Sequence, residues 1–126
     1  MSVCIGVIED EPELLELLRI LLESSGFSVA AVDHPDGVHE MMQSMHPDLF
    51  VVDLMLPGTN GIDLARQLRA SGGADTPMIA LSASKLMLEV ANASNLFQAT
   101  MSKPFDVFTL LEYVQQYTRD RAAPVP

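Results

Sequence analysis

The feature that most limits the fold of this chain is the apolar run of residues 49–52, which leads into Asp53 and then into Pro57-Gly58. Four consecutive apolar residues that end in two valines predict a strand buried on both faces, as in a parallel sheet. Proline followed by glycine then breaks the chain. Asp53 therefore lies at the carboxyl end of a buried strand, where open α/β sheets bind ligands. By itself, Asp53 fits equally well a loop residue that caps the next turn.

Strand-like patterns alternate with amphipathic helical patterns along the chain. We expect strands near residues 3–8, 28–32, 49–53, 77–81 and 98–101. We expect helices over residues 13–25, 36–45, 86–93 and 107–117, and a further helix between Asn60, its expected N-cap, and Ser71. Five strands alternating with five helices predict one α/β domain, a parallel sheet with right-handed crossovers and helices on both faces.

Helical spacing also assigns side chains to the core or to the surface. One face of the first helix, which we expect to be buried, carries Leu14, Leu17, Leu18 and Leu21. In the second helix we expect three methionines to fill the core: Met41, Met42 and Met45. The polar side of the third helix carries Arg66 and Arg69. The single cysteine, Cys4, lies in an apolar run and is predicted to be a buried, inert thiol.

Charge and hydropathy narrow the class of function. The chain has 17 acidic residues against 7 lysines and arginines, a formal net charge of −10 at pH 7. Such a surface repels nucleic-acid phosphates and anionic lipid, so we expect neither direct nucleic-acid binding nor membrane association. No apolar run reaches the roughly 18 residues of a membrane span, and no signal peptide is evident, so we expect a cytoplasmic protein.

Polar residues follow four of the predicted strands at the same end. Glu9 and Asp10 follow the first strand, Asp53 the third, Ser82 the fourth and Lys103 the fifth. Because the carboxyl ends of parallel strands meet at one edge of a sheet, we expect these side chains to gather there. Three crowded carboxylates need a counter-charge, and Mg²⁺ prefers oxygen ligands and keeps waters that a phosphate can replace.

The combination of one exposed carboxylate, a magnesium ion, an ammonium group and a hydroxyl donor suits a phosphoryl group held on Asp53. The aspartate would be the nucleophile, giving an acyl phosphate. Taken singly, the acids of residues 9–11 also fit a helix N-terminus, and Lys103 also fits a surface residue. Their occurrence together at four strand ends favours a shared site.

Four segments carry a family resemblance: Ile8-Glu9-Asp10-Glu11-Pro12, Asp53-Leu54-Met55-Leu56-Pro57-Gly58 with Gly61, Leu81-Ser82-Ala83, and Lys103-Pro104-Phe105. In this order and spacing the chain resembles a response-regulator receiver domain of two-component signalling over nearly its whole length. The resemblance implies a flavodoxin-like doubly wound fold with strand order 2-1-3-4-5. It also implies a receiver domain over residues 1–118, followed by a tail or the start of a linker over residues 119–126.

The resemblance implies that Asp53 is the phosphoacceptor and that the cofactor is Mg²⁺. Asp10 and Asp53 would bind the ion through their side chains, Met55 through its backbone carbonyl and Glu9 through water. Ser82 and Lys103 would contact the phosphoryl oxygens, and the Lys103–Pro104 bond is expected to be cis.

The segment that would change conformation on phosphorylation, called the switch here, departs from the family pattern. Receivers usually carry tyrosine or phenylalanine three residues before the lysine, whereas this chain has Thr100 there. We therefore expect Ser82 and Thr100 to bound a switch segment that works without an aromatic rotamer change, or Phe97 to take the place of the missing aromatic residue.

Met55 and Ser84, which would flank an attacking water, are neither acids nor amides. This predicts slow to moderate self-dephosphorylation.

The implied partners are a sensor histidine kinase or a histidine phosphotransfer protein as donor, and an effector protein or fused output domain, with a phosphorylation-linked dimer as a further possibility. The chain would catalyse only its own phosphorylation and dephosphorylation. Alternatives stay open. A degenerate receiver would bind partners without phosphorylation. An Asp-nucleophile phosphatase would need a second carboxylate as general acid at the position of Met55. A flavin binder would need a loop that binds phosphate after the first strand, where the acids of residues 9–11 would repel it.

Overall fold

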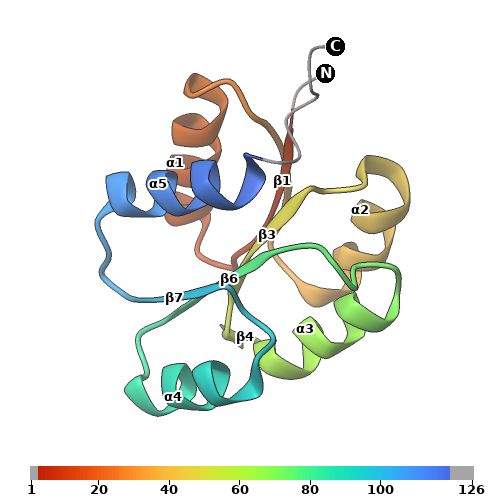
Figure 1. Ribbon diagram of the computed structural model, residues 1–126, viewed down its shortest axis with the longest axis vertical. Coiled ribbons are helices and arrows are strands. Elements are labelled where there is room, and N and C mark those ends of the chain that lie inside the picture. The colour runs from red at the N-terminus through yellow and green to blue at the C-terminus, as the bar shows by residue number, and fades with distance from the viewer. Residues whose placement is uncertain (1–2, 120–126) are drawn as a thin grey trace.

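The computed structural model describes residues 3–119, in which strands and helices alternate as expected (Figure 1). The strands of the main sheet are β1 (Cys4–Ile8), β2 (Ser28–Val32), β3 (Leu49–Asp53), β6 (Met78–Ser82) and β7 (Ala99–Ser102). All of their pairings are parallel, and their order is β2-β1-β3-β6-β7. This is the order 2-1-3-4-5 of the flavodoxin-like fold, so the predicted fold class is confirmed. Of the predicted tail, residues 120–126 lie outside the described part.

The helices are α1 (Pro12–Ser24), α2 (Val38–Met45), α3 (Gly61–Ala70), α4 (Lys85–Ser94) and α5 (Val107–Thr118), with a 3₁₀ turn at Pro35–Gly37. They cover both faces of the sheet (Figure 1). Leu18 of α1 and Leu110 of α5 belong to one buried cluster, and Met41 of α2 and Leu68 of α3 to the cluster on the other face. Within residues 3–119, no helix has the length and apolar character needed to cross a membrane.

A short hairpin that we did not predict follows Asp53. Strands β4 (Met55–Leu56) and β5 (Thr59–Asn60) pair antiparallel around a turn in which Gly58 has a φ of 76°, a conformation that favours glycine. Asn60 caps α3 as expected, because its Oδ1 accepts a hydrogen bond of 2.8 Å from the Ile62 amide. A Cβ on Gly61 would lie 2.4 Å from the Cα of Leu54, so only glycine lets α3 start against the chain that leaves Asp53.

Two predicted core residues are exposed. Leu17 is 48% exposed because the buried stripe of α1 runs through Leu18 and Leu22, and adjacent helical residues point about 100° apart. Met45 is 45% exposed because it is the last residue of α2, at the surface, whereas Met41 is buried. Both assignments were wrong, since helical spacing alone does not show where a neighbouring layer ends.

Arg69 is not the solvated surface residue that its place on α3 indicated. Its guanidinium is half-buried and donates hydrogen bonds to the carbonyls of Gly73 (3.0 Å), Ala74 (3.2 Å), Thr76 and Leu96. Burial lowers the pKa of this guanidinium. Arg69 therefore joins the chain after α3 to the chain after α4.

Candidate functional site

The predicted site residues lie at the carboxyl ends of the parallel strands. Asp53 and Ser82 are the last residues of β3 and β6, and Lys103 directly follows β7. The register places Asp53 opposite Leu81 and Ser82 opposite Ser102, so these strand ends are level with one another. Parallel pairing therefore delivers residues that are far apart in the sequence to one edge of the sheet.

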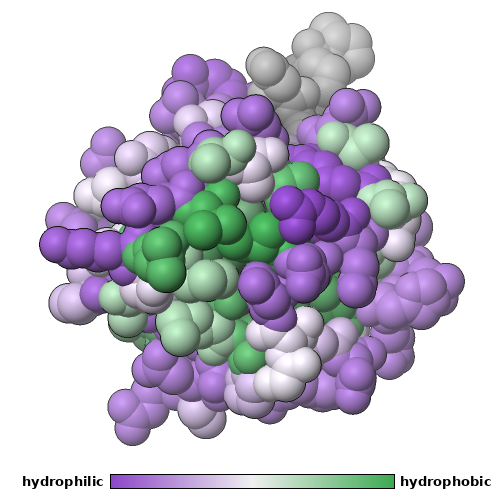
Figure 2. Space-filling model, turned by 90° about the horizontal axis from the view of Figure 1, so that it is seen from below, coloured by the Kyte–Doolittle hydropathy of each residue, from purple (hydrophilic) through white to green (hydrophobic). Residues whose placement is uncertain are grey.

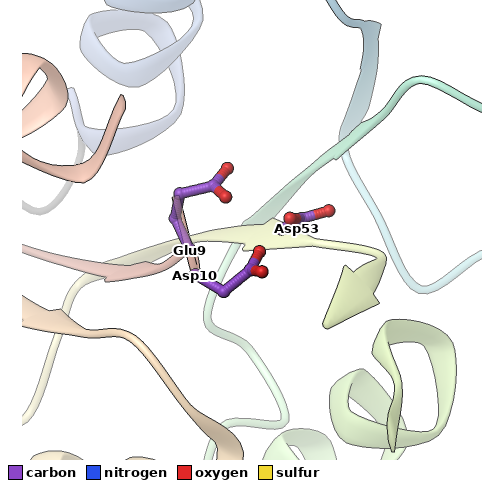
Figure 3. Close-up of side chains that lie close together, drawn as sticks. All are labelled: Glu9, Asp10 and Asp53. Atoms are coloured by element: carbon purple, nitrogen blue, oxygen red, sulfur yellow. The ribbon is translucent and has the colours of Figure 1, made fainter. Parts of the chain in front are cut away.

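Three carboxylates converge at this edge. Glu9 and Asp10, which follow β1, point toward Asp53 (Figure 3). One carboxylate oxygen from each of the three lies within 4.8 Å of the others, a spacing at which they could hold a metal ion. The acidic cluster predicted from the sequence is thus present in space.

Asp53 itself is only 3% exposed, so the expectation of an exposed carboxylate was wrong. Its Oδ1 accepts a hydrogen bond of 2.9 Å from the Met55 amide, and its Oδ2 accepts one of 3.3 Å from Lys103 Nζ. These two donors cover the carboxylate that the sequence placed at an open strand end. The side chain of Met55, by contrast, is turned outward and the residue is 56% exposed.

Lys103 is the positive centre of the site. Its Nζ lies 2.9 Å from Glu9 Oε1, 3.0 Å from Glu11 Oε1 and 3.3 Å from Asp53 Oδ2. Partial burial by itself would lower the pKa of Lys103, but the carboxylates of Glu9 and Glu11 outweigh it, so the pKa of the ammonium is raised. Our sequence reasoning did not include Glu11 in the site. Its place directly after Asp10, at the same strand end, was the available signal.

Glu9 is fully buried and incompletely satisfied. Its Oε2 accepts a hydrogen bond of 3.1 Å from the Glu11 amide, whereas Oε1 has no hydrogen-bond partner, because the approach of Lys103 lacks hydrogen-bond geometry. Burial raises the pKa of Glu9 to about 7, although the neighbouring Lys103 acts in the opposite direction. A buried oxygen that makes an ion pair but accepts no hydrogen bond, beside two further carboxylates, belongs to a donor set that fits a hard, oxygen-seeking cation such as Mg²⁺.

Ser82 is fully buried, and its Oγ accepts a hydrogen bond of 3.0 Å from the Ser84 amide. Within residues 3–119 the Ser82 hydroxyl donates to no partner, so its proton is available. The side chain of Ser84 is engaged elsewhere, as it accepts a hydrogen bond of 3.2 Å from the Met87 amide and caps α4.

Thr100 lies on β7, and its side chain bonds to α4 rather than to the acidic cluster. Its Oγ1 donates a hydrogen bond of 3.1 Å to Asn92 Oδ1. Phe97 is partly buried against the core between the sheet and α4. The peptide bond between Lys103 and Pro104 is cis, as predicted.

A groove of about 520 Å³ lies beside the lysine. Its lining is Glu11, Glu13, Leu14, Leu17, Ala83, Lys103, Pro104, Phe105 and Val107. The groove joins the apolar side of α1 to the loop that follows β7, and it opens next to the acidic cluster.

Comparison with known proteins assigns this arrangement to a family. A model of the response regulator receiver domain matches residues 5–115. The DNA-binding response regulator MtrA of Mycolicibacterium smegmatis is 42% identical over 77 residues, which are 61% of this chain and 33% of MtrA. The phosphate regulon transcriptional regulatory protein PhoB of Rhizobium meliloti is 46% identical over 65 residues, 52% of this chain and 29% of PhoB. The matched stretch spans about a third of these relatives.

Solved structures give the same fold. The response regulator TrrA of Thermotoga maritima, in complex with Mg²⁺-BeF, has a TM-score of 0.81 at 25% identity, and the match covers 92% of this chain and 99% of the TrrA chain. A receiver domain of Methylobacillus flagellatus has a TM-score of 0.82 at 29% identity, and the match covers 93% of this chain and 99% of that domain.

Proposed function

This chain belongs to the response regulator receiver domain family, and on that premise we propose that it accepts a phosphoryl group on Asp53 in a Mg²⁺-dependent reaction. The observation that carries the proposal is the convergence of Glu9, Asp10 and Asp53 around one end of β3, with the Lys103 ammonium 3.3 Å from Asp53. A carboxylate among like charges, paired with the single ammonium of Lys103, is well placed for chemistry and poorly placed for stability.

In the proposed step, an oxygen of the Asp53 carboxylate forms a bond to phosphorus as the bond from phosphorus to the donor breaks. The leaving group departs with the bonding electron pair, and Asp53 becomes an acyl phosphate. Lys103 and the free Ser82 hydroxyl proton donate to the phosphoryl oxygens, on which negative charge is spread during transfer.

The residues that would hold Mg²⁺ are Asp10 and Asp53 through their side chains, Met55 through its backbone carbonyl and Glu9 through water. When bound, the ion supplies positive charge that neutralises the phosphoryl oxygens. The buried Glu9 oxygen without a hydrogen-bond partner supports this assignment.

The donor we propose is a histidine kinase or a histidine phosphotransfer protein. The groove beside Lys103 supports a docking site there, because the exposed Leu17 gives α1 an apolar surface next to the site. Apolar residues also gather on the end of the molecule shown in Figure 2, bordered by hydrophilic ones. Since the matched relatives are about three times as long as the matched stretch, we propose that output passes to a fused domain, an effector protein or a phosphorylation-linked dimer partner.

For the switch, we propose that the segment from Ser82 to Thr100 responds to phosphorylation without an aromatic rotamer change. The hydrogen bond between Thr100 and Asn92 supports this, because it joins β7 directly to α4. Loss of that bond on phosphorylation would move α4 relative to the sheet. NMR shifts of residues 82–103 that stay unchanged with a phosphoryl mimic would contradict the proposal.

Intact mass after incubation with acetyl phosphate and Mg²⁺ tests the function. The wild-type chain should gain one phosphoryl group, and Asp53→Asn should gain none. Asp48→Asn is the matched control, because Asp48 lies at the opposite end of the strand that carries Asp53 and should not affect labelling. A wild-type chain that gains no mass would contradict the proposal and favour a receiver that binds partners without phosphorylation.

A further inference from the structure

Lys103 must change partners if Asp53 is phosphorylated. An ammonium group has three N–H donors, and three carboxylate oxygens already lie within 3.3 Å of Lys103 Nζ. Two of these oxygens, Glu11 Oε1 and Asp53 Oδ2, accept hydrogen bonds from Nζ, so a phosphoryl oxygen that approaches Asp53 competes with them for the ammonium. The three carboxylates differ clearly in their exposure to solvent.

The side chain of Glu9 is fully buried and that of Asp53 is 4% exposed, whereas that of Glu11 is 62% exposed. A buried carboxylate that loses its cation is left uncompensated, which is costly. An exposed carboxylate is rehydrated when it loses its partner, so the loss costs little. Glu11 is thus the partner that can leave most readily.

Resting on the proposed function, we propose that Glu11 is the counterion that releases Lys103 to the phosphoryl group, and so is a positioning residue for phosphoryl transfer. In the unphosphorylated chain its Oε1 accepts a hydrogen bond of 3.0 Å from Lys103. It therefore competes with the incoming phosphoryl oxygens for the same N–H donor. Removal of its charge should leave Lys103 more available and speed phosphorylation.

Glu11→Gln and Glu13→Gln form a matched pair for the test. Both remove one negative charge near the start of α1 and both residues line the groove, but only Glu11 contacts Lys103. With acetyl phosphate and Mg²⁺, the initial phosphorylation rate of Glu11→Gln should exceed that of Glu13→Gln by about two- to fivefold, the range that one exposed ion pair supports.

Equal rates in the two variants, or a slower rate in Glu11→Gln, would overturn the role of Glu11 alone. A wild-type chain that gains no phosphoryl group would instead overturn the proposed function and this inference with it. The two failures are therefore distinguishable.

A second readout needs neither metal nor phosphodonor. The ¹⁵N NMR signal of the Lys103 ammonium, recorded without Mg²⁺, should shift in Glu11→Gln and stay at the wild-type position in Glu13→Gln. An unshifted signal in Glu11→Gln would overturn the contact on which the inference rests. Thermal unfolding of both variants at the wild-type temperature would show that the fold is unchanged.

Discussion

The two ends of the parallel sheet treat their polar side chains in opposite ways. At the amino end, Asp48 Oδ2 accepts a hydrogen bond of 2.9 Å from the amide of Cys4, which is the first residue of β1. Gln98 Oε1 accepts one of 2.7 Å from the amide of Met78, which is the first residue of β6. Each of these side chains thus satisfies a strand amide that would otherwise lack a partner.

At the carboxyl end, the side chains of Asp53 and Glu9 each accept one bond from a nearby amide, but their carboxylates also crowd against one another. Glu9, Asp10 and Asp53 converge, and a buried oxygen of Glu9 has no hydrogen-bond partner. An aspartate therefore stabilises the fold at one end of β3 and is set among like charges at the other. Polar groups at the amino end therefore serve stability, whereas those at the carboxyl end are arranged for a ligand and lower stability until it binds.

The largest effect on stability should come from Arg69, which belongs to the amino end. Arg69→Ala removes hydrogen bonds to the carbonyls of Gly73, Ala74, Thr76 and Leu96, and should lower the free energy of unfolding by about 3 kcal/mol. Urea denaturation measures this. Arg66→Ala is the control, because the pair that Arg66 makes with Asp63 is exposed and is worth less than about 1 kcal/mol. Equal effects of the two substitutions would contradict the stabilising role of polar side chains at the amino end.

The second prediction contrasts the two aspartates at the opposite ends of β3. Asp48→Ala leaves the Cys4 amide unsatisfied and should lower the free energy of unfolding by about 2 kcal/mol. Asp53→Asn removes one of three crowded charges and should raise it by up to about 1 kcal/mol. Denaturation in metal-free buffer distinguishes them, with Asp48→Asn, which keeps an acceptor oxygen, as control. Destabilisation by Asp53→Asn would contradict the view that the carboxyl end is strained.

The third prediction concerns Mg²⁺. The ion should raise the unfolding temperature of the wild-type chain, since a ligand at ten times its Kd stabilises the folded state by about 1.4 kcal/mol. Asp10→Asn should abolish this rise, and Asp48→Asn should leave it intact. Calorimetry with and without Mg²⁺ measures both, and an equal rise in all three chains would argue against a site at Glu9, Asp10 and Asp53.

The smallest effect is expected at the thiol of Cys4. Burial raises the pKa of this thiol, and the nearby Asp48 carboxylate raises it further, so little thiolate forms at pH 8. Reaction with a disulfide reagent should be slow in the folded chain and fast in urea. Asp48→Ala should speed the folded reaction, because it removes the neighbouring charge. A fast reaction of the folded wild-type chain would contradict the predicted burial.

Hydrophobic periodicity predicted an α/β domain with a parallel sheet and helices on both faces, whereas the strand order 2-1-3-4-5 came from the family resemblance. The predicted bounds of the five strands of the main sheet and of the helices lie within two residues of the observed ones. The site followed from topology, since parallel strands bring Asp53, Ser82 and Lys103 to one edge. The exposure of Leu17 and the contacts of Arg69 depend on tertiary packing, which local patterns do not encode.

Reductive trapping of the phosphorylated chain tests most directly the claim that the carboxyl end of the sheet serves phosphoryl transfer to Asp53. Borohydride reduces an aspartyl phosphate to homoserine, which peptide mass spectrometry can locate. After treatment with acetyl phosphate and Mg²⁺, homoserine should appear at position 53. Homoserine at Asp10 or at any other acidic residue, or none at all, would contradict the account.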